Sequence, residues 1–163
     1  MLIQPIFAYR QGRPGFTIFN AVFDWNPDAP EEWWTSAIGS VRPGDRVDSY
    51  VSLVEGEDGA PDSYDMYVGT AGGFEVHNNR VVDAGQSGNE SWAMFVLEHQ
   101  PESCEAYPPD QIFTFENIYL EVEFMAVEKP NWVAAQKAPA CDSEATVIDA
   151  RTVAITWDTG AVR

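Results

Sequence analysis

The sequence predicts an all-β domain built as a sandwich of antiparallel sheets. Three observations support this: apolar and polar residues alternate at a period of two, turn-forming clusters recur at fairly regular intervals, and no segment has a capped helical period. Short strands without helices to cover parallel crossovers favour antiparallel sheets packed face to face. A chain of 163 residues is long enough to bury a hydrophobic core, so we expect one domain over residues 1–163.

The expected strands are rich in aromatic and β-branched residues. Residues 92–98 differ from the rest, because they form a nearly continuous apolar run that ends at Glu98. Residues 111–126 are expected to form one long strand or two strands joined at a bulge. The full set of expected strands is residues 16–25, 46–54, 63–69, 92–98, 111–126 and 152–157.

Clusters of Gly, Pro, Asn and Asp separate these segments, as expected for tight turns. The nearest approach to a helical pattern, residues 30–37, is too short to predict a helix. The expected turns are Gly56-Glu57-Asp58-Gly59, Gly72-Gly73, His77-Asn78-Asn79, residues 85–88 and Pro108-Pro109.

The chain is strongly acidic, with 26 acidic residues against 9 basic ones and a formal net charge of −17. Such a charge repels phosphate backbones and anionic lipid surfaces, so neither nucleic acid nor a membrane is an expected partner. It suits either a well-solvated surface or a protein that works at low pH, where protonation reduces self-repulsion. No apolar run is long enough to span a bilayer, and no signal peptide is visible at the start.

The two cysteines, Cys104 and Cys141, both lie in polar loops. An even pair in such loops permits one disulfide, although the pairing does not follow from the sequence. Asn89-Glu90-Ser91 matches the N-glycosylation sequon. Together these features permit secretion.

The familiar catalytic and metal-binding motifs are missing. His77 and His99 are the only histidines, and neither has the motif context of a serine or cysteine nucleophile. The sequence has no patterned set of zinc ligands, and Glu55-Gly56-Glu57-Asp58 is better explained as a solvated hairpin turn than as a calcium loop. No metal and no cofactor are therefore expected.

Carboxylates, amides and aromatic rings remain as candidates. Glu98 lies either at the exposed end of a strand or in a partly buried place where desolvation raises a carboxyl pKa. The tryptophans, among them Trp33 and Trp34, are either sandwich core or a platform for sugar rings. The residues by themselves leave both questions open.

Several blocks, taken in order, resemble the glutamic peptidases (eqolisins), a family of secreted fungal acid endopeptidases. In that family the counterparts of Gln4 and Glu98 are the catalytic residues. The blocks cover most of the chain, apart from a family segment that precedes the glutamine and is expected to be absent here. They are Leu2-Ile3-Gln4-Pro5, Asn20 to Pro27, Pro43 to Val47, Ala93 to His99 and Thr152 to Trp157.

The resemblance implies a concanavalin- or jelly-roll-like sandwich of two bent sheets with a substrate groove on a concave face. It implies that Glu98 is the general base that activates water, and that Gln4 holds this water and stabilises the oxyanion. It also places Asp24 and Asn26 near a polypeptide substrate and implies an extracellular location. The oligomeric state does not follow from it.

Two other functions are compatible with the sequence. The first is a non-catalytic sandwich that binds carbohydrate or peptide through aromatic residues such as Trp33 and Trp34. The second is a jelly-roll glycosidase, which requires two carboxylates facing each other across the groove. Glu98 has no partner in a matched motif for the second function.

Overall fold

A computed structural model describes residues 2–9, 16–24, 31–35, 39–42, 44–81, 93–96, 103–135 and 141–161. These residues group into two compact units, Met1–Trp92 and Ala93–Arg163, which we describe one at a time. In the described stretches the strands are antiparallel, and the helix is a single 3₁₀ turn, Cys104–Ala106 (η1). No helix there has the length needed to cross a membrane.

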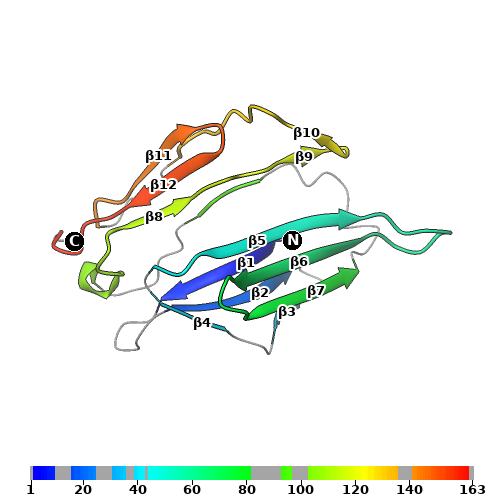
Figure 1. Cartoon of the computed structure of the whole chain (residues 1–163), viewed down its shortest axis with the longest axis horizontal. Coiled ribbons are helices and arrows are strands. Elements are labelled where there is room, and N and C mark those ends of the chain that lie inside the picture. Colours follow the sequence, from blue (N-terminus) through cyan, green and yellow to red (C-terminus); the bar gives the residue numbers. More distant parts are fainter. Residues whose placement is uncertain are drawn as a thin grey trace. The chain divides into compact units, whose positions relative to one another are not determined.

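The first unit consists of two antiparallel sheets (Figure 1). In sheet A, β2 lies between β1 and β3 and also pairs with β4, whereas sheet B has the order β5-β6-β7. The strand bounds in sheet A are β1 Leu2–Tyr9, β2 Phe16–Asp24, β3 Glu31–Trp34 and β4 Gly39–Val41. Those in sheet B are β5 Val47–Val54, β6 Ser63–Thr70 and β7 Glu75–Val81.

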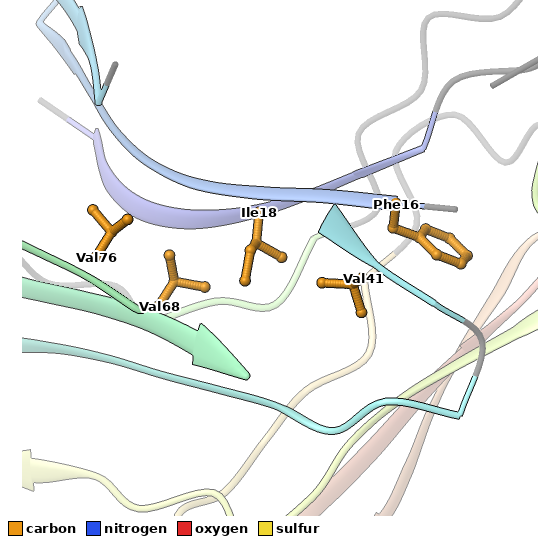
Figure 2. Packing of buried hydrophobic residues seen from close by; sticks show 5 residues of the cluster. All are labelled: Phe16, Ile18, Val41, Val68 and Val76. Atoms are coloured by element: carbon orange, nitrogen blue, oxygen red, sulfur yellow. The ribbon is translucent and has the colours of Figure 1, made fainter. Parts of the chain in front are cut away.

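The core of this unit lies between the two sheets, as Figure 2 shows. Phe16, Ile18 and Val41 enter it from sheet A, and Val68 and Val76 enter it from sheet B. Since successive side chains on a strand point to opposite faces, these positions identify the inward face of each sheet. The first unit is therefore a β-sandwich, as the sequence predicts.

The alternation predicted for residues 63–69 is confirmed by β6, where Met66 is 0% and Val68 1% exposed. The predicted turn at residues 77–79 is wrong, because these residues lie within β7 and pair with β6. His77, Asn78 and Asn79 are poor strand formers, and cross-strand pairing overrides their local preference. By contrast, residues 55–59 form the expected turn between β5 and β6, with Asp58 and Gly59 at positive φ.

The second unit contains a three-stranded sheet, sheet C, of order β11-β12-β8, and a separate β9–β10 hairpin. The prediction of a strand over residues 152–157 is confirmed by β12, which pairs with a strand on either side. The strand bounds are β8 Ile112–Phe115, β9 Glu121–Val122, β10 Met125–Ala126, β11 Glu144–Asp149 and β12 Thr152–Thr156.

Two of the expected strands are shorter or different in the structure. Residues 111–126 do not form one strand or two joined at a bulge, because the chain leaves sheet C after Phe115 and then folds into the β9–β10 hairpin. Asn117, Glu123 and Phe124 have positive φ, which interrupts an extended chain. Of residues 92–98, only 93–96 are described, and they are not in a strand.

The core of the second unit is built around a disulfide between Cys104 and Cys141. The two cysteines are 37 positions apart and are buried together with Tyr107 and Trp157. Tyr107 and Trp157 stack with ring centroids 5.7 Å apart, and the indole N–H of Trp157 donates to the carbonyl of Pro108 at 2.9 Å. The disulfide thus closes a loop that packs on the end of β12.

Candidate functional site

Gln4 lies in the interior of β1 and pairs with Ala21 on β2. Its neighbours Pro5 and Ile3 pair with Asn20 and Val22, which belong to the inward face of sheet A. Alternation along the strand therefore directs Gln4 to the outward face, away from the core between the sheets. The Gln4 side chain is half-buried there.

The outward face around Gln4 is apolar. Ala21, directly opposite, is 0% exposed, and the partners two positions away on β2 are Phe19 and Phe23. On β1 itself the same face carries Leu2, Ile6 and Ala8, all half-buried. An amide in such surroundings acts at a lower effective dielectric than in water, so its N–H group is a stronger donor to a developing negative charge.

The other predicted site residues are only partly described. Asp24 ends β2, where its backbone pairs with Glu31, and its side chain is not among those described. Asn26 and Glu98 lie outside the described residues. The pairing of Gln4 with Glu98, and the places of Asp24 and Asn26 beside a substrate, therefore remain predictions.

In residues 93–96, the described part of the segment that leads to Glu98, Phe95 makes the aromatic contacts. The Phe95 ring lies 4.6 Å from that of Phe115 on β8 and 5.3 Å from that of Trp132. Trp132 in turn donates its indole N–H to the carbonyl of Ala150 at 2.9 Å. Met94 is 61% and Val96 54% exposed, so within residues 93–96 the packing against β8 and Trp132 goes through Phe95.

Asn20 forms a polar contact inside the core of the first unit. It is 0% exposed, and its Nδ2 donates to Oδ1 of Asn78 at 2.9 Å. Longer contacts of 3.3 and 3.4 Å join the same nitrogen to the carbonyls of Val76 and Met66. The Asn20 Oδ1 atom is buried and has no hydrogen-bond partner among the residues that the structure describes. One amide therefore connects β2 of sheet A with both β6 and β7 of sheet B.

Trp33, a candidate platform for sugar rings, is already in contact with a cation. The Arg80 guanidinium carbon lies 5.0 Å from the centroid of the Trp33 ring, at cation–π distance. Arg80 belongs to β7 and Trp33 to β3, so this contact joins the two sheets of the first unit. A sugar cannot stack on the ring face that Arg80 covers. The side chain of Trp34 is not among those described.

A different aromatic group was not apparent from the sequence. Tyr50, Tyr67 and His77 occupy one cross-strand row of sheet B, where Tyr50 pairs with Tyr67 and Tyr67 with His77. Their parity along the strands is opposite to that of the core residues Met66 and Val68. In the sequence, these three residues occupy the strand positions that alternate with the core positions. This pattern can be recognised only after the strand boundaries are known.

Comparisons with known proteins support the fold. No protein-family model matches the chain, and no curated protein sequence matches it. Among solved structures, the chain is similar to aspergilloglutamic peptidase from Aspergillus niger, with a TM-score of 0.59 and 17% sequence identity. The likeness covers 93% of this chain and 85% of that one. At this identity it establishes the fold, an antiparallel β-sandwich.

Proposed function

We propose that this chain is an acid endopeptidase of the glutamic type, with Gln4 and Glu98 as its catalytic pair. The observation that carries the proposal is the likeness of fold to aspergilloglutamic peptidase over 93% of the chain. The sequence blocks around Gln4 and Glu98 add support, because they occur in the family's order. The proposed substrate is a polypeptide, and the proposed reaction is hydrolysis of a peptide bond.

The position of Gln4 suits the role of oxyanion donor. It lies within an eight-residue strand, which holds a side chain more precisely than a loop does. Its amide is uncharged, so it stabilises negative charge on the substrate oxygen without lowering the pKa of a nearby carboxyl group, as a cation would. The apolar residues around it on the outward face of sheet A exclude water from part of its surface.

Glu98 has the role of general base in this proposal. Its carboxylate takes a proton from water as the water oxygen attacks the scissile carbonyl carbon. The same carboxyl group then gives the proton to the leaving amine as the C–N bond breaks. Gln4 orients the water and donates to the carbonyl oxygen while it carries negative charge. Asp24 and Asn26 are proposed to contact the substrate.

An extracellular location belongs to the same proposal. The disulfide between Cys104 and Cys141 supports it, because disulfides persist in oxidising compartments and are rare in the cytosol. The net charge of −17 also suits an acidic medium, where protonated carboxyl groups reduce the repulsion within the folded chain.

The test is digestion of an unfolded protein substrate at about pH 2–4 by wild type, Gln4→Ala and Glu98→Gln. We expect cleavage by wild type and a loss of about 100-fold or more in each variant, as for removal of a general base or an oxyanion donor. Glu116→Gln is the matched control for Glu98→Gln, because Glu116 is an exposed carboxylate in the second unit.

The control is expected to retain wild-type activity. Urea unfolding of each variant separates loss of chemistry from loss of fold. Absence of cleavage by correctly folded wild type, or equal cleavage by wild type and the two catalytic variants, would contradict the proposal.

A further inference from the structure

The outward face of sheet B carries a row of three aromatic side chains, one from each strand. Tyr50 on β5 lies with its ring centroid 5.4 Å from that of Tyr67 on β6, and the two rings are within 17° of parallel. Tyr67 lies 4.7 Å from the His77 ring on β7. We call this surface the Tyr67 face.

Two further contacts hold the tyrosines in place. A Cβ atom added at Gly69 would overlap the Tyr67 phenol, so Tyr67 lies along the sheet over the Gly69 backbone. The Tyr50 hydroxyl donates to Oδ2 of Asp65 at 2.8 Å. Tyr50 nevertheless remains 43% exposed, and His77 is exposed as well. The rings are therefore positioned by the protein and still accessible.

Carboxylates lie on both sides of this aromatic row. Asp65 comes two residues before Tyr67 on β6, and Glu75 comes two residues before His77 on β7, where it pairs with Gly69. Antiparallel pairing thus places the two acids on opposite sides of the row. A third acid of this face, Asp48, is paired with Arg46 at 2.7 Å.

Basic groups do not balance Asp65 and Glu75 on the described part of this face. Arg46 is already paired with Asp48, and Arg80 lies on the inward parity of β7, over Trp33. The whole chain has a net charge of −17, which attracts cations and repels anions over a longer range. The Tyr67 face therefore complements a partner with positive charges and apolar stems.

The spacing on the sheet restricts the kind of partner. Asp65 and Gly69 are four residues apart on β6, and Glu75 pairs with Gly69, so the two carboxylate rows are about 13 Å apart along the strand axis. In an extended peptide, residues i and i+4 are also about 13 Å apart and point to the same side. The side chain at i+2 then lies above Tyr67.

We propose that the Tyr67 face binds an extended polypeptide segment with basic residues at positions i and i+4. The two basic groups contact Asp65 and Glu75, and the middle side chain packs on the tyrosine rings. Within the first unit this face lies on sheet B, whereas Gln4 points outward from sheet A. The site is therefore distinct from the position of Gln4, and it requires no catalytic activity.

The test measures binding of a dye-labelled peptide Ser-Lys-Ser-Leu-Ser-Lys-Ser to wild-type protein by fluorescence polarisation at neutral pH and low salt. A second peptide, with the same composition but its lysines at i and i+3, directs its lysines to opposite sides of an extended chain. We expect it to bind about 10-fold more weakly. This comparison uses wild-type protein alone, so it does not depend on the folding of any variant.

Variants then locate the site on the protein. Asp65→Asn/Glu75→Gln is expected to weaken binding of the first peptide about 10-fold, and Tyr67→Ser about 3-fold. Glu57→Gln/Asp58→Asn removes the same charge from the exposed β5–β6 turn and is expected to change binding less than 2-fold.

Four results would overturn the proposal. Equal affinity for both peptides, or equal losses in the two double variants, would mean attraction by overall charge alone. Displacement of the peptide by a neutral oligosaccharide such as cellohexaose would identify a sugar-binding surface instead. Absence of peptide binding at low salt would exclude the site directly, because screening is weakest there.

Discussion

The side-chain amide of Asn20 on β2 donates to the side-chain oxygen of Asn78 on β7 at 2.9 Å, and this contact joins the two sheets through their hydrophobic core. The same nitrogen also faces the carbonyls of Met66 and Val76. Three oxygen atoms thus surround one donor group. This arrangement requires a donor at position 20 and disfavours an anion there.

Asn20→Asp is therefore expected to make folding stability depend on pH. Burial and the three facing oxygens raise the pKa of the new carboxyl group above its unfolded value of about 3.9. Because the folded state holds this proton more tightly, stability is highest below that value and falls as the pH rises through the folded pKa. We expect a loss of about 3–5 kcal/mol at neutral pH, and a smaller loss in acid. Urea unfolding at pH 3 and pH 7 measures both.

Asn79→Asp is the matched control for this prediction. Asn79 is next to Asn78 on β7, but it is exposed and donates to the hydroxyl of Ser63 at 3.0 Å on the outer side of the sheet. A new carboxylate there stays in contact with water but faces the Asp65 carboxylate on β6, so we expect it to cost no more than about 1 kcal/mol at pH 7 and less at pH 3. Similar pH dependence in both variants would refute the role assigned to Asn20.

Removing the disulfide is expected to destabilise the second unit selectively. Cys104→Ser/Cys141→Ser opens a loop that spans 37 positions, which corresponds to about 3–5 kcal/mol of unfolding free energy in the chain-entropy model. Trp157 packs against the two cysteines, so its fluorescence should report this loss at lower urea concentration than in wild type. Treatment of wild type with a reducing agent should give the same shift. If neither the double variant nor the reducing agent shifted the urea unfolding transition, the disulfide between Cys104 and Cys141 would be contradicted.

Gly39 is expected to tolerate no side chain. A Cβ atom added there would overlap the ring of Phe74, which packs against the core of the first unit. Gly39→Ala should therefore lower the free energy of unfolding by about 1–3 kcal/mol through overpacking. Gly72→Ala is the control, because a Cβ atom at Gly72 would come no closer than 3.7 Å to the Thr70 hydroxyl. Equal melting temperatures of Gly39→Ala and Gly72→Ala would contradict this packing.

The Tyr50 hydroxyl is expected to ionise at unusually high pH. Its hydrogen bond to Asp65 is the main cause, followed by burial and by the negative charge of Asp65, and together they raise the pKa of Tyr50 above 10.0. The folded protein thus retains this proton to a higher pH than the unfolded chain does. The contribution of this hydrogen bond to folding stability is therefore lost as the pH rises above about 10. Ultraviolet difference titration should show Asp65→Asn lowering the pKa of Tyr50.

A second tyrosine gives the control for that measurement. Tyr119 donates to Oε1 of Glu121 at 2.7 Å, and this hydrogen bond is the main cause of its raised pKa. Glu121→Gln should lower the pKa of Tyr119 and leave Tyr50 unchanged. If Asp65→Asn and Glu121→Gln each shifted both tyrosines, or neither, the two local assignments would be wrong.

Local sequence predicted the strands that alternate clearly, and it failed where pairing overrides local preference. β2, β5, β6 and β12 appear within a residue of the predicted bounds, because their apolar parity is strong. β7 was not predicted, since Asn78 and Asn79 favour turns on their own. Asn78 lies in a strand because β6 pairs with it, and its side-chain oxygen accepts the bond from Asn20.

The sequence by itself determined the all-β class, the antiparallel pairing and the net negative charge, whereas the choice of Gln4 and Glu98 as candidates rests on the resemblance of the surrounding blocks to the glutamic peptidases. The period of the apolar residues is a local property and the net charge is a sum over residues, so both can be read without coordinates. Only the tertiary structure decided that Gln4 points outward from sheet A, that Cys104 and Cys141 are bonded, and that Tyr50, Tyr67 and His77 form one row. These relationships depend on strand register and on contacts between residues distant in the chain, and a shift of one residue in register would reverse the faces.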